Sequence, residues 1–176
     1  MYRIKSTEKI NYLVGEEKIL NISTVPYNEK ICHFIGEFSK ELNNNKDLKR
    51  FSDLKTLAFW CRKKNILNFK RKFLSEKTRV GLGLLFHITP SNIPTNFAYS
   101  LIFGLITGNS NIVKVPSKNF EQISIICKIL NKILKRKKFN FIKNMISIVR
   151  YSNNDHYTKK ISSICKARLI WGGDET

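Results

Sequence analysis

Polar side chains that could hold an anion or a reacting carbonyl gather in one short stretch of the sequence. Residues 80–113 form a run of 34 residues without Lys, Arg, Asp or Glu, yet it includes Thr89, Pro90, Ser91 and Asn92. Polar groups in a buried run need hydrogen-bond partners or a ligand. At the start of a helix, backbone N–H groups and the Asn92 amide could stabilise an anion or a developing oxyanion.

Two further segments have chemistry that suits a dinucleotide. Lys114 is the first charged residue after the charge-free run, and Ser117 and Lys118 follow it closely. The Lys114 ammonium could meet a ribose hydroxyl or a phosphate. Near the end of the chain, Gly172 and Gly173 permit a close approach of the backbone to a pyrophosphate.

The elements around these residues alternate between strand and helix. Apolar runs predict strands at 80–88, 111–115, 145–149 and 168–171, and three-and-four spacing predicts helices at 95–107, 117–134 and 155–165. This alternation predicts an α/β fold, a Rossmann-like parallel sheet with crossover helices. Ligands of such sheets bind beyond the carboxyl ends of the strands. The three polar segments described above, around residues 89–92, 114–118 and 172–173, lie at or just after such strand ends. The GxGxxG fingerprint is absent, so spacing alone indicates only a nucleotide-binding α/β domain.

The part of the chain before this pattern predicts a mostly helical lead-in. We therefore divide the chain into a lead-in, 1–76, and a Rossmann-like domain, 77–176. Residues 1–25 alternate polar and apolar around Gly15, which predicts an N-terminal hairpin. Two helices are predicted after it, one following Asn28 and one from Ser52 or Asp53.

The chain is strongly basic, with 32 Lys and Arg against 13 Asp and Glu and a net charge of +19. Clustered cations bind phosphate backbones, so one hypothesis is a nucleic-acid-binding module that uses Lys63, Lys64, Arg71, Arg136 and Lys138. However, a bias toward Lys, Ile and Asn runs through the whole chain, and a charge run is usually a solvated face. We therefore expect no nucleic-acid partner.

The four cysteines, Cys32, Cys61, Cys127 and Cys165, lie far apart and lack metal-ligand spacing. We expect them to be reduced and structural, and we expect no metal site. His87 is expected to be a packed strand histidine rather than an acid or base.

No segment of the sequence predicts membrane insertion. The longest strongly apolar run, residues 97–106, is half the roughly 20 residues that a spanning helix needs. The first residues lack the apolar core of a signal peptide, so we expect a cytoplasmic protein.

Two motifs resemble those of one enzyme family. The run from Gly83 to Lys118 and the run from Trp171 to Thr176 resemble the LuxC-type acyl-CoA reductases, the fatty-acid reductase component of bacterial luminescence. That family belongs to the aldehyde dehydrogenase superfamily, whose members carry Pro-x-Asn-x-Pro and Gly-Asn…Lys-x-x-Ser/Glu motifs in this order. The resemblance covers roughly residues 80–176 and implies an aldehyde dehydrogenase-like cofactor domain, of which this chain would hold an incomplete, N-terminal portion.

The resemblance also implies roles for individual residues. Asn92 matches the oxyanion-hole asparagine, and Lys114 matches the lysine that contacts the adenosine ribose. Ser117 stands where NAD-preferring relatives often have Glu, so with Lys118 it favours NADPH, because a carboxylate would repel a 2′-phosphate. Gly173 matches the glycine of a Gly-Ser pair in the superfamily. The next residue, Asp174, stands where many members have the serine that contacts the phosphate. The implied cofactor-binding residues are Thr89, Pro90, Ser91, Lys114, Ser117, Lys118, Gly172 and Gly173.

The implied reaction is the NADPH-dependent reduction of a long-chain acyl-CoA to the fatty aldehyde through an acyl-cysteine thioester. In the superfamily the nucleophilic cysteine follows the Gly-Gly motif, and none of the four cysteines fills that place. We therefore expect this portion alone to be inactive; a non-catalytic NADP-binding remnant is the alternative. The family implies an acyl-CoA or acyl-protein substrate, an acyl-protein synthetase and an acyltransferase as partners, and a homo-oligomer at full length.

Overall fold

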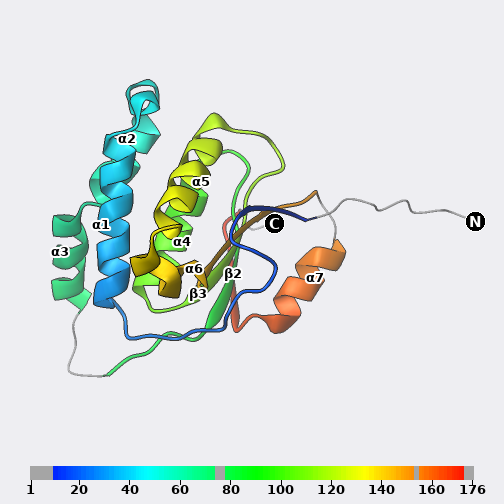
Figure 1. Cartoon of the computed structure of the whole chain (residues 1–176). Helices are drawn as coiled ribbons and strands as arrows, with labels where there is room; N and C mark the ends of the chain where they lie inside the picture. The colour runs from blue at the N-terminus through cyan, green and yellow to red at the C-terminus, as the bar shows by residue number, and fades with distance from the viewer. Residues whose placement is uncertain (1–9, 74–77, 153–154, 173–176) are drawn as a thin grey trace, which may run out of the picture.

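A five-stranded sheet lies at the centre of the computed structural model, which describes residues 10–73, 78–152 and 155–172 (Figure 1). The strands are β1 Asn11–Val14, β2 Leu84–Ile88, β3 Ser110–Lys114, β4 Ile146–Arg150 and β5 Ala167–Ile170. Their spatial order is β1-β4-β3-β2-β5; β2 to β5 run parallel, and β1 pairs antiparallel with β4. The predicted α/β fold with a Rossmann-like parallel sheet is thus confirmed.

Helices cover both faces of this sheet. They are α1 Glu29–Asn43, α2 Ser52–Trp60, α3 Lys63–Phe73, α4 Asn96–Ile106, α5 Glu121–Leu134, α6 Asn140–Lys143 and α7 Asp155–Ile164, with 3-10 turns at Lys46–Arg50 and Lys137–Phe139. Helices α4 and α5 lie against one face, α1 packs on them from outside, and α7 lies on the opposite face (Figure 1). The helical lead-in therefore forms an outer layer on the α4 and α5 side.

Local sequence explains the first helix of that layer. The Asn28 side chain accepts a hydrogen bond from the Lys30 N–H at 3.0 Å and so caps the N-terminus of α1. The residues at three-and-four spacing turn inward, and Asn44 ends the helix. The predicted second helix is also confirmed, although the predicted caps are not, because Phe51 precedes its first residue, Ser52. Helix α3 was not singled out by the sequence pattern.

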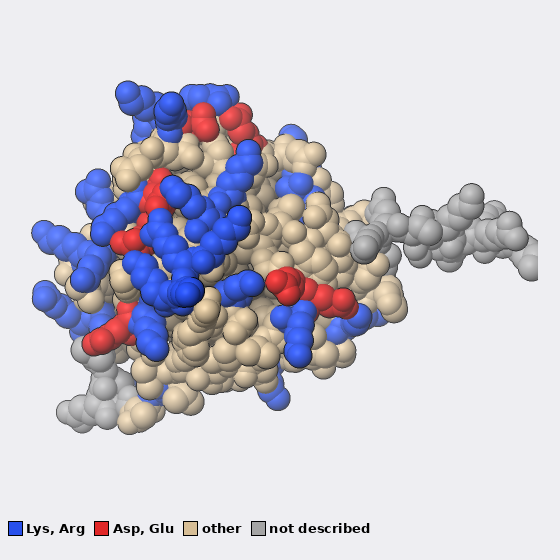
Figure 2. Space-filling model, viewed as in Figure 1, with Lys and Arg blue, Asp and Glu red and all other residues tan. Residues whose placement is uncertain are grey.

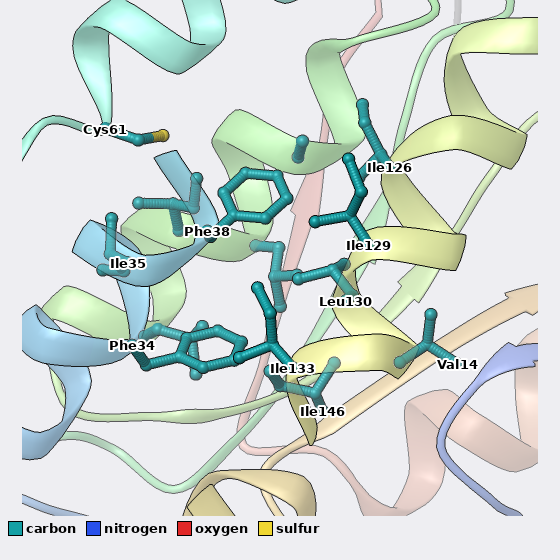
Figure 3. Packing of buried hydrophobic residues seen from close by; sticks show 14 of the residues in the cluster. Val14, Phe34, Ile35, Phe38, Cys61, Ile126, Ile129, Leu130, Ile133 and Ile146 are labelled. Carbon is teal, nitrogen blue, oxygen red and sulfur yellow. The ribbon is translucent and has the colours of Figure 1, made fainter. Parts of the chain in front are cut away.

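The main hydrophobic cluster lies between the sheet and the helices α1, α4 and α5 (Figure 3). Phe34 and Phe38 of α1 meet Leu130 and Ile133 of α5, and Ile146 closes the cluster from β4. Each fully buried side chain of this size contributes about 1.5–3 kcal/mol. The lead-in helices therefore share their core with the sheet domain, and the division at residue 76 stays a prediction.

A smaller cluster lies on the other face, under α7. Leu84, Phe86, Ile112 and Val149 project from alternate positions of three strands and meet Ile161 of α7. Because both faces of these strands are covered, their sequences are mostly apolar, as is usual for parallel sheets.

The hairpin predicted around Gly15 is wrong for the described residues of that stretch, 10–25. Strand β1 pairs with β4, with Asn11 opposite Arg150, and residues 19–25 form no second strand. Gly15 has φ +76°, and a Cβ there would come within 2.3 Å of the Ile146 carbonyl oxygen. The glycine therefore allows a turn that passes close to the backbone of β4. The alternating polarity predicted a strand here but did not identify β4 as its partner.

Two predicted boundaries move by four residues, and the other predicted strand and helix boundaries by at most one. Strand β2 begins at Leu84 rather than at residue 80, because Gly83 adopts φ +117° and Leu84 N–H bonds to Asn21 Oδ1 at 2.7 Å. Helix α5 begins at Glu121 rather than at residue 117, which leaves residues 115–120 as a loop beyond β3. That loop is longer than predicted, and it contains two of the candidate site residues.

Candidate nucleotide site

The carboxyl ends of β2, β3, β4 and β5 meet at one edge of the sheet, because these four strands are parallel. Counted in chain order, the parallel strands stand as 3-2-1-4, so the order reverses between β2 and β5. α/β proteins bind nucleotides beside a reversal of this kind, and we name this part of the edge the crevice. The structure brings the first two predicted loops, and Gly172 of the third, to this edge.

The first loop is fastened to the end of the neighbouring strand. Thr89 donates two hydrogen bonds to the Lys114 carbonyl oxygen, from its N–H at 3.3 Å and from its hydroxyl at 2.8 Å. Pro90 follows, and Ser91 and Asn92 are exposed. The loop leads into α4 with Thr95 at the N-cap, so the N–H groups of that helix face the same edge. Asn92 is thus exposed close to the helix start, as an oxyanion donor would need to be.

The second loop surrounds a half-buried lysine. Lys114 Nζ lies 4.8 Å from the centre of the Tyr151 ring, and burial lowers the pKa of this ammonium. The Ser117 hydroxyl lies 3.4 Å from the Tyr151 carbonyl oxygen, to which it donates. The Tyr151 hydroxyl pairs with Thr158 of α7 at 3.1 Å. Sequence reasoning missed Tyr151, although its place just after a predicted strand matches that of the other loops.

Two more cations lie at this edge. Lys118 is exposed and its Nζ lies 5.2 Å from the Phe120 ring centre, while Arg150, the last residue of β4, donates from Nη1 to Asn119 Oδ1. Within the described residues, no carboxylate forms an ion pair with Lys114, Lys118 or Arg150. The edge therefore carries positive charge that an anionic ligand could neutralise. Arg150 was also missed by the sequence analysis.

The third loop begins at the reversal itself. Trp171 follows β5, and its N–H donates to the Ile88 carbonyl oxygen at 3.0 Å. Gly172 comes next and is exposed. Gly173, the other predicted glycine of this loop, lies outside the described residues.

A polar network lies beneath the crevice, inside the charge-free run. His87 Nδ1 and Ser100 Oγ are 2.7 Å apart, and His87 Nε2 lies 2.9 Å from Asn111 Oδ1. All three side chains are fully buried, and burial lowers the pKa of His87 to about 4. The indole Nε1 of Trp171 donates to Ser100 Oγ at 2.9 Å. His87 is thus a packed, neutral strand histidine, as predicted.

The cysteines take no part in this edge. Cys32, Cys61 and Cys127 are buried, and burial raises the pKa of each thiol, to about 12 for Cys127. A raised pKa keeps a thiol protonated and inert. Cys165 precedes β5, at the end of the strand opposite the crevice, and its Sγ lies 3.3 Å from the Ser162 carbonyl oxygen. The described residues contain no group of His, Cys, Asp or Glu suited to a metal ion.

The basic surface is partly neutralised by carboxylates. Figure 2 shows Lys and Arg side chains gathered over the helical layer with a few acidic residues among them. Arg136 bonds to both Glu37 and Glu41, and Lys132 lies 2.7 Å from Glu41. Lys138 lies 3.6 Å from Glu37. These pairs join α5 and the turn after it to α1, so carboxylates neutralise Arg136 and Lys138, two of the cations named in the nucleic-acid hypothesis.

A family model described as acyl-CoA reductase (LuxC) matches residues 21–176. No curated protein and no solved structure matches the chain. Among the helices of the described residues, none has the length and apolar character needed to cross a bilayer.

Proposed function

The chain belongs to the LuxC family of acyl-CoA reductases, and from that premise we propose that its sheet edge binds NADPH for the reduction of a long-chain acyl-CoA to the fatty aldehyde. The observation that carries the proposal is that the loops after β2 and β3, and Gly172 after β5, lie at the carboxyl edge on either side of the reversal, with Lys114, Lys118 and Arg150 at the same edge. We further propose residues 77–176 as the cofactor domain, because every residue of this edge lies within them.

The preference for NADPH over NADH rests on the second loop. Ser117 places a neutral hydroxyl three residues after Lys114, and the neighbouring Lys118 adds positive charge. A 2′-phosphate on the adenosine ribose would meet cations and no carboxylate among the described residues. In this arrangement Lys114 contacts the ribose, and Gly172 lets the backbone approach the pyrophosphate.

The first loop serves the acyl group. When the cofactor is bound, its nicotinamide supplies the hydride that reduces an acyl thioester to the aldehyde and releases the thiolate. The Asn92 amide and the backbone N–H groups at the start of α4 donate to the carbonyl oxygen as it gains negative charge. Thr89 holds this loop against β3. Pro90 and Ser91 connect Thr89 to Asn92.

The acyl-carrying thiolate is, we propose, none of the four cysteines of this chain. Three are buried with raised thiol pKa values, and Cys165 lies at the opposite end of its strand. The chain then supplies cofactor binding and oxyanion stabilisation, and alone it binds NADPH without turnover. Its substrate is acyl-CoA or an acyl-protein, with an acyl-protein synthetase and an acyltransferase as partners, in a homo-oligomeric enzyme.

A direct test is to titrate the chain with NADPH and NADH by calorimetry. We expect NADPH to bind more tightly and Lys114→Met to weaken its binding about tenfold, a loss of about 1.4 kcal/mol. The matched control is Lys55→Met, which removes an exposed lysine from α2. Failure of NADPH to bind, or an equal loss in the two variants, would reject the proposal. Acyl-CoA-dependent oxidation of NADPH should be absent from the chain alone.

A further inference from the structure

Trp171 combines a buried anchor with an exposed surface at the crevice. Its backbone N–H bonds to Ile88 and its indole N–H bonds to the buried Ser100, yet 40% of the residue remains exposed. An indole with its N–H satisfied inside the protein keeps a broad apolar surface available outside. Trp171 lies at the reversal between β2 and β5, where the nucleotide is proposed to bind.

The hydrogen bonds behind the indole have only one consistent set of directions. Asn111 Nδ2 donates to the Asn109 carbonyl oxygen at 2.7 Å, so Asn111 Oδ1 must accept from His87 Nε2–H. A neutral His87 with its proton on Nε2 accepts at Nδ1, so the Ser100 hydroxyl donates to it. The Ser100 oxygen then accepts from the Trp171 indole. Every member of this chain of bonds is satisfied.

This network is buried among apolar residues, where apolar side chains would lose less hydration free energy than polar ones. A fully satisfied polar network contributes little more stability than a well-packed apolar replacement, but it fixes geometry. The Asn111 amide fits only because residue 104 is a glycine: a Cβ on Gly104 would come within 1.8 Å of Asn111 Oδ1. The geometry that the network fixes at its outer end is that of the indole.

We propose that Ser100 and His87 are positioning residues that hold Trp171 as a wall of the nucleotide crevice, where its indole contacts a planar heteroaromatic ring of the bound dinucleotide. This inference rests on the proposed function, because it takes the ligand to be a dinucleotide. Ser100 and His87 act through Trp171 and do not touch the ligand.

The first experiment measures the indole alone. In a Trp60→Phe background, Trp171 is the only tryptophan, and its emission and its quenching by acrylamide report its exposure. We expect Ser100→Ala to shift the emission to longer wavelength and to raise the quenching constant about twofold, because the anchor is worth about one hydrogen bond. The control is Ser110→Ala, which removes another buried serine, one bonded to Ile22 instead. An unchanged Trp171 in Ser100→Ala would overturn the positioning role.

The second experiment measures ligand contact. NADP⁺ does not absorb tryptophan emission, so its quenching of Trp171 requires proximity; 2′,5′-ADP and nicotinamide mononucleotide show which ring is responsible. By calorimetry, Ser100→Ala and Trp171→Phe should each weaken NADP⁺ binding about fivefold, and the double variant should be no weaker than either. Ser110→Ala should bind normally, and thermal unfolding of every variant separates lost affinity from lost folding.

The outcomes separate this inference from the function on which it rests. Absence of NADP⁺ and NADPH binding to the unaltered chain rejects the proposed function, and with it the ligand contact. Normal NADP⁺ binding without quenching of Trp171, or with additive losses in the double variant, rejects the inference and leaves the proposed function standing.

Discussion

The Lys114 ammonium lies over the face of the Tyr151 ring, with Nζ 4.8 Å from the ring centre. The two residues come from the ends of neighbouring strands, β3 and β4, and both project toward the α7 face of the sheet. A long lysine side chain is thereby held at one place at the carboxyl edge. The lysine is positioned for a ligand before any ligand arrives, which lowers the entropy lost on binding.

Replacing the ring should therefore weaken cofactor binding. Tyr151→Leu removes the aromatic face, and we expect NADPH affinity to fall about threefold, as a cation–π contact at a partly exposed site is worth about 0.5–1 kcal/mol. Tyr151→Phe keeps the ring and loses only the bond to Thr158, so its affinity should stay near that of the unaltered chain. Equal affinities of the Leu and Phe variants, measured by calorimetry, would contradict a role for the ring.

A carboxylate at position 117 should change the choice of cofactor. We expect Ser117→Glu to reduce the preference for NADPH over NADH about tenfold, because the new charge would repel a 2′-phosphate close to Lys114. Ser117→Gln has the same size without the charge and should keep most of the preference. The measurement is the ratio of the two dissociation constants, and a ratio that is unchanged by Glu would place the 2′-phosphate elsewhere.

The buried His87 should make the protein less stable in mild acid. Its pKa is about 4 in the folded chain and 6.5 in its ordinary state. The unfolded chain therefore binds a proton first, so stability is full above pH 6.5 and falls as the pH drops toward 4, by about 3 kcal/mol. Denaturant unfolding at a series of pH values measures this loss.

Two variants assign that loss to one histidine. His87→Asn should flatten the dependence between pH 4 and 6.5, whereas His33→Asn, which removes an exposed histidine, should leave it in place. Hydrogen bonds from Lys40 and Lys132 lower the pKa values of Glu37 and Glu41, so the stability that these carboxylates contribute begins to fall as the pH drops to their ordinary pKa of 4.5. The two histidine variants are therefore compared between pH 5 and 6.5, above that loss.

Gly104 should tolerate no side chain. In Gly104→Ala the new Cβ would overlap Asn111 Oδ1 and approach His87 Nε2 to 3.1 Å, so the buried network must shift. We expect a loss of about 2–3 kcal/mol in the free energy of unfolding. The control is Gly36→Ala in α1, where a Cβ meets only the Lys63 side chain at 3.5 Å and helix propensity favours alanine by up to about 1 kcal/mol.

The ion pairs between α1 and α5 should matter modestly and respond to salt. Arg136→Met removes the contacts to Glu37 and Glu41, and we expect the chain to lose about 1 kcal/mol at low ionic strength and less at high ionic strength. Lys135→Met removes a neighbouring exposed lysine and should have little effect. A loss of the same size in the two variants, by thermal unfolding, would show that net charge rather than the pairing is responsible.

The sequence predicted the parallel sheet because its strands are short apolar runs separated by helices of the right period. It failed at β1, because alternation identifies a strand but not a partner that lies far along the chain. It also placed the start of α5 too early, since Ser117 and Lys118 resemble a helix start but remain in a loop.

The candidate site was predicted in part for the same reason. Thr89, Lys114 and Gly172 lie at or just after strand ends that the sequence predicts, so the topology alone brings them to one edge. The contacts of Tyr151 and Ser100 depend on strand register and on which face of a helix turns inward. Those properties follow from the packing of the whole sheet, and no local pattern contains them.

The pairing of Asn11 with Arg150 also dictates when the protein can be completed. During synthesis the first strand leaves the ribosome 139 residues before its partner, about 7 to 28 seconds at usual elongation rates. Throughout that interval the edge of β1 has no strand to bind. Arg150 enters the site edge by the same event that gives β1 its partner, so the cationic edge and the β1 margin of the sheet are finished together.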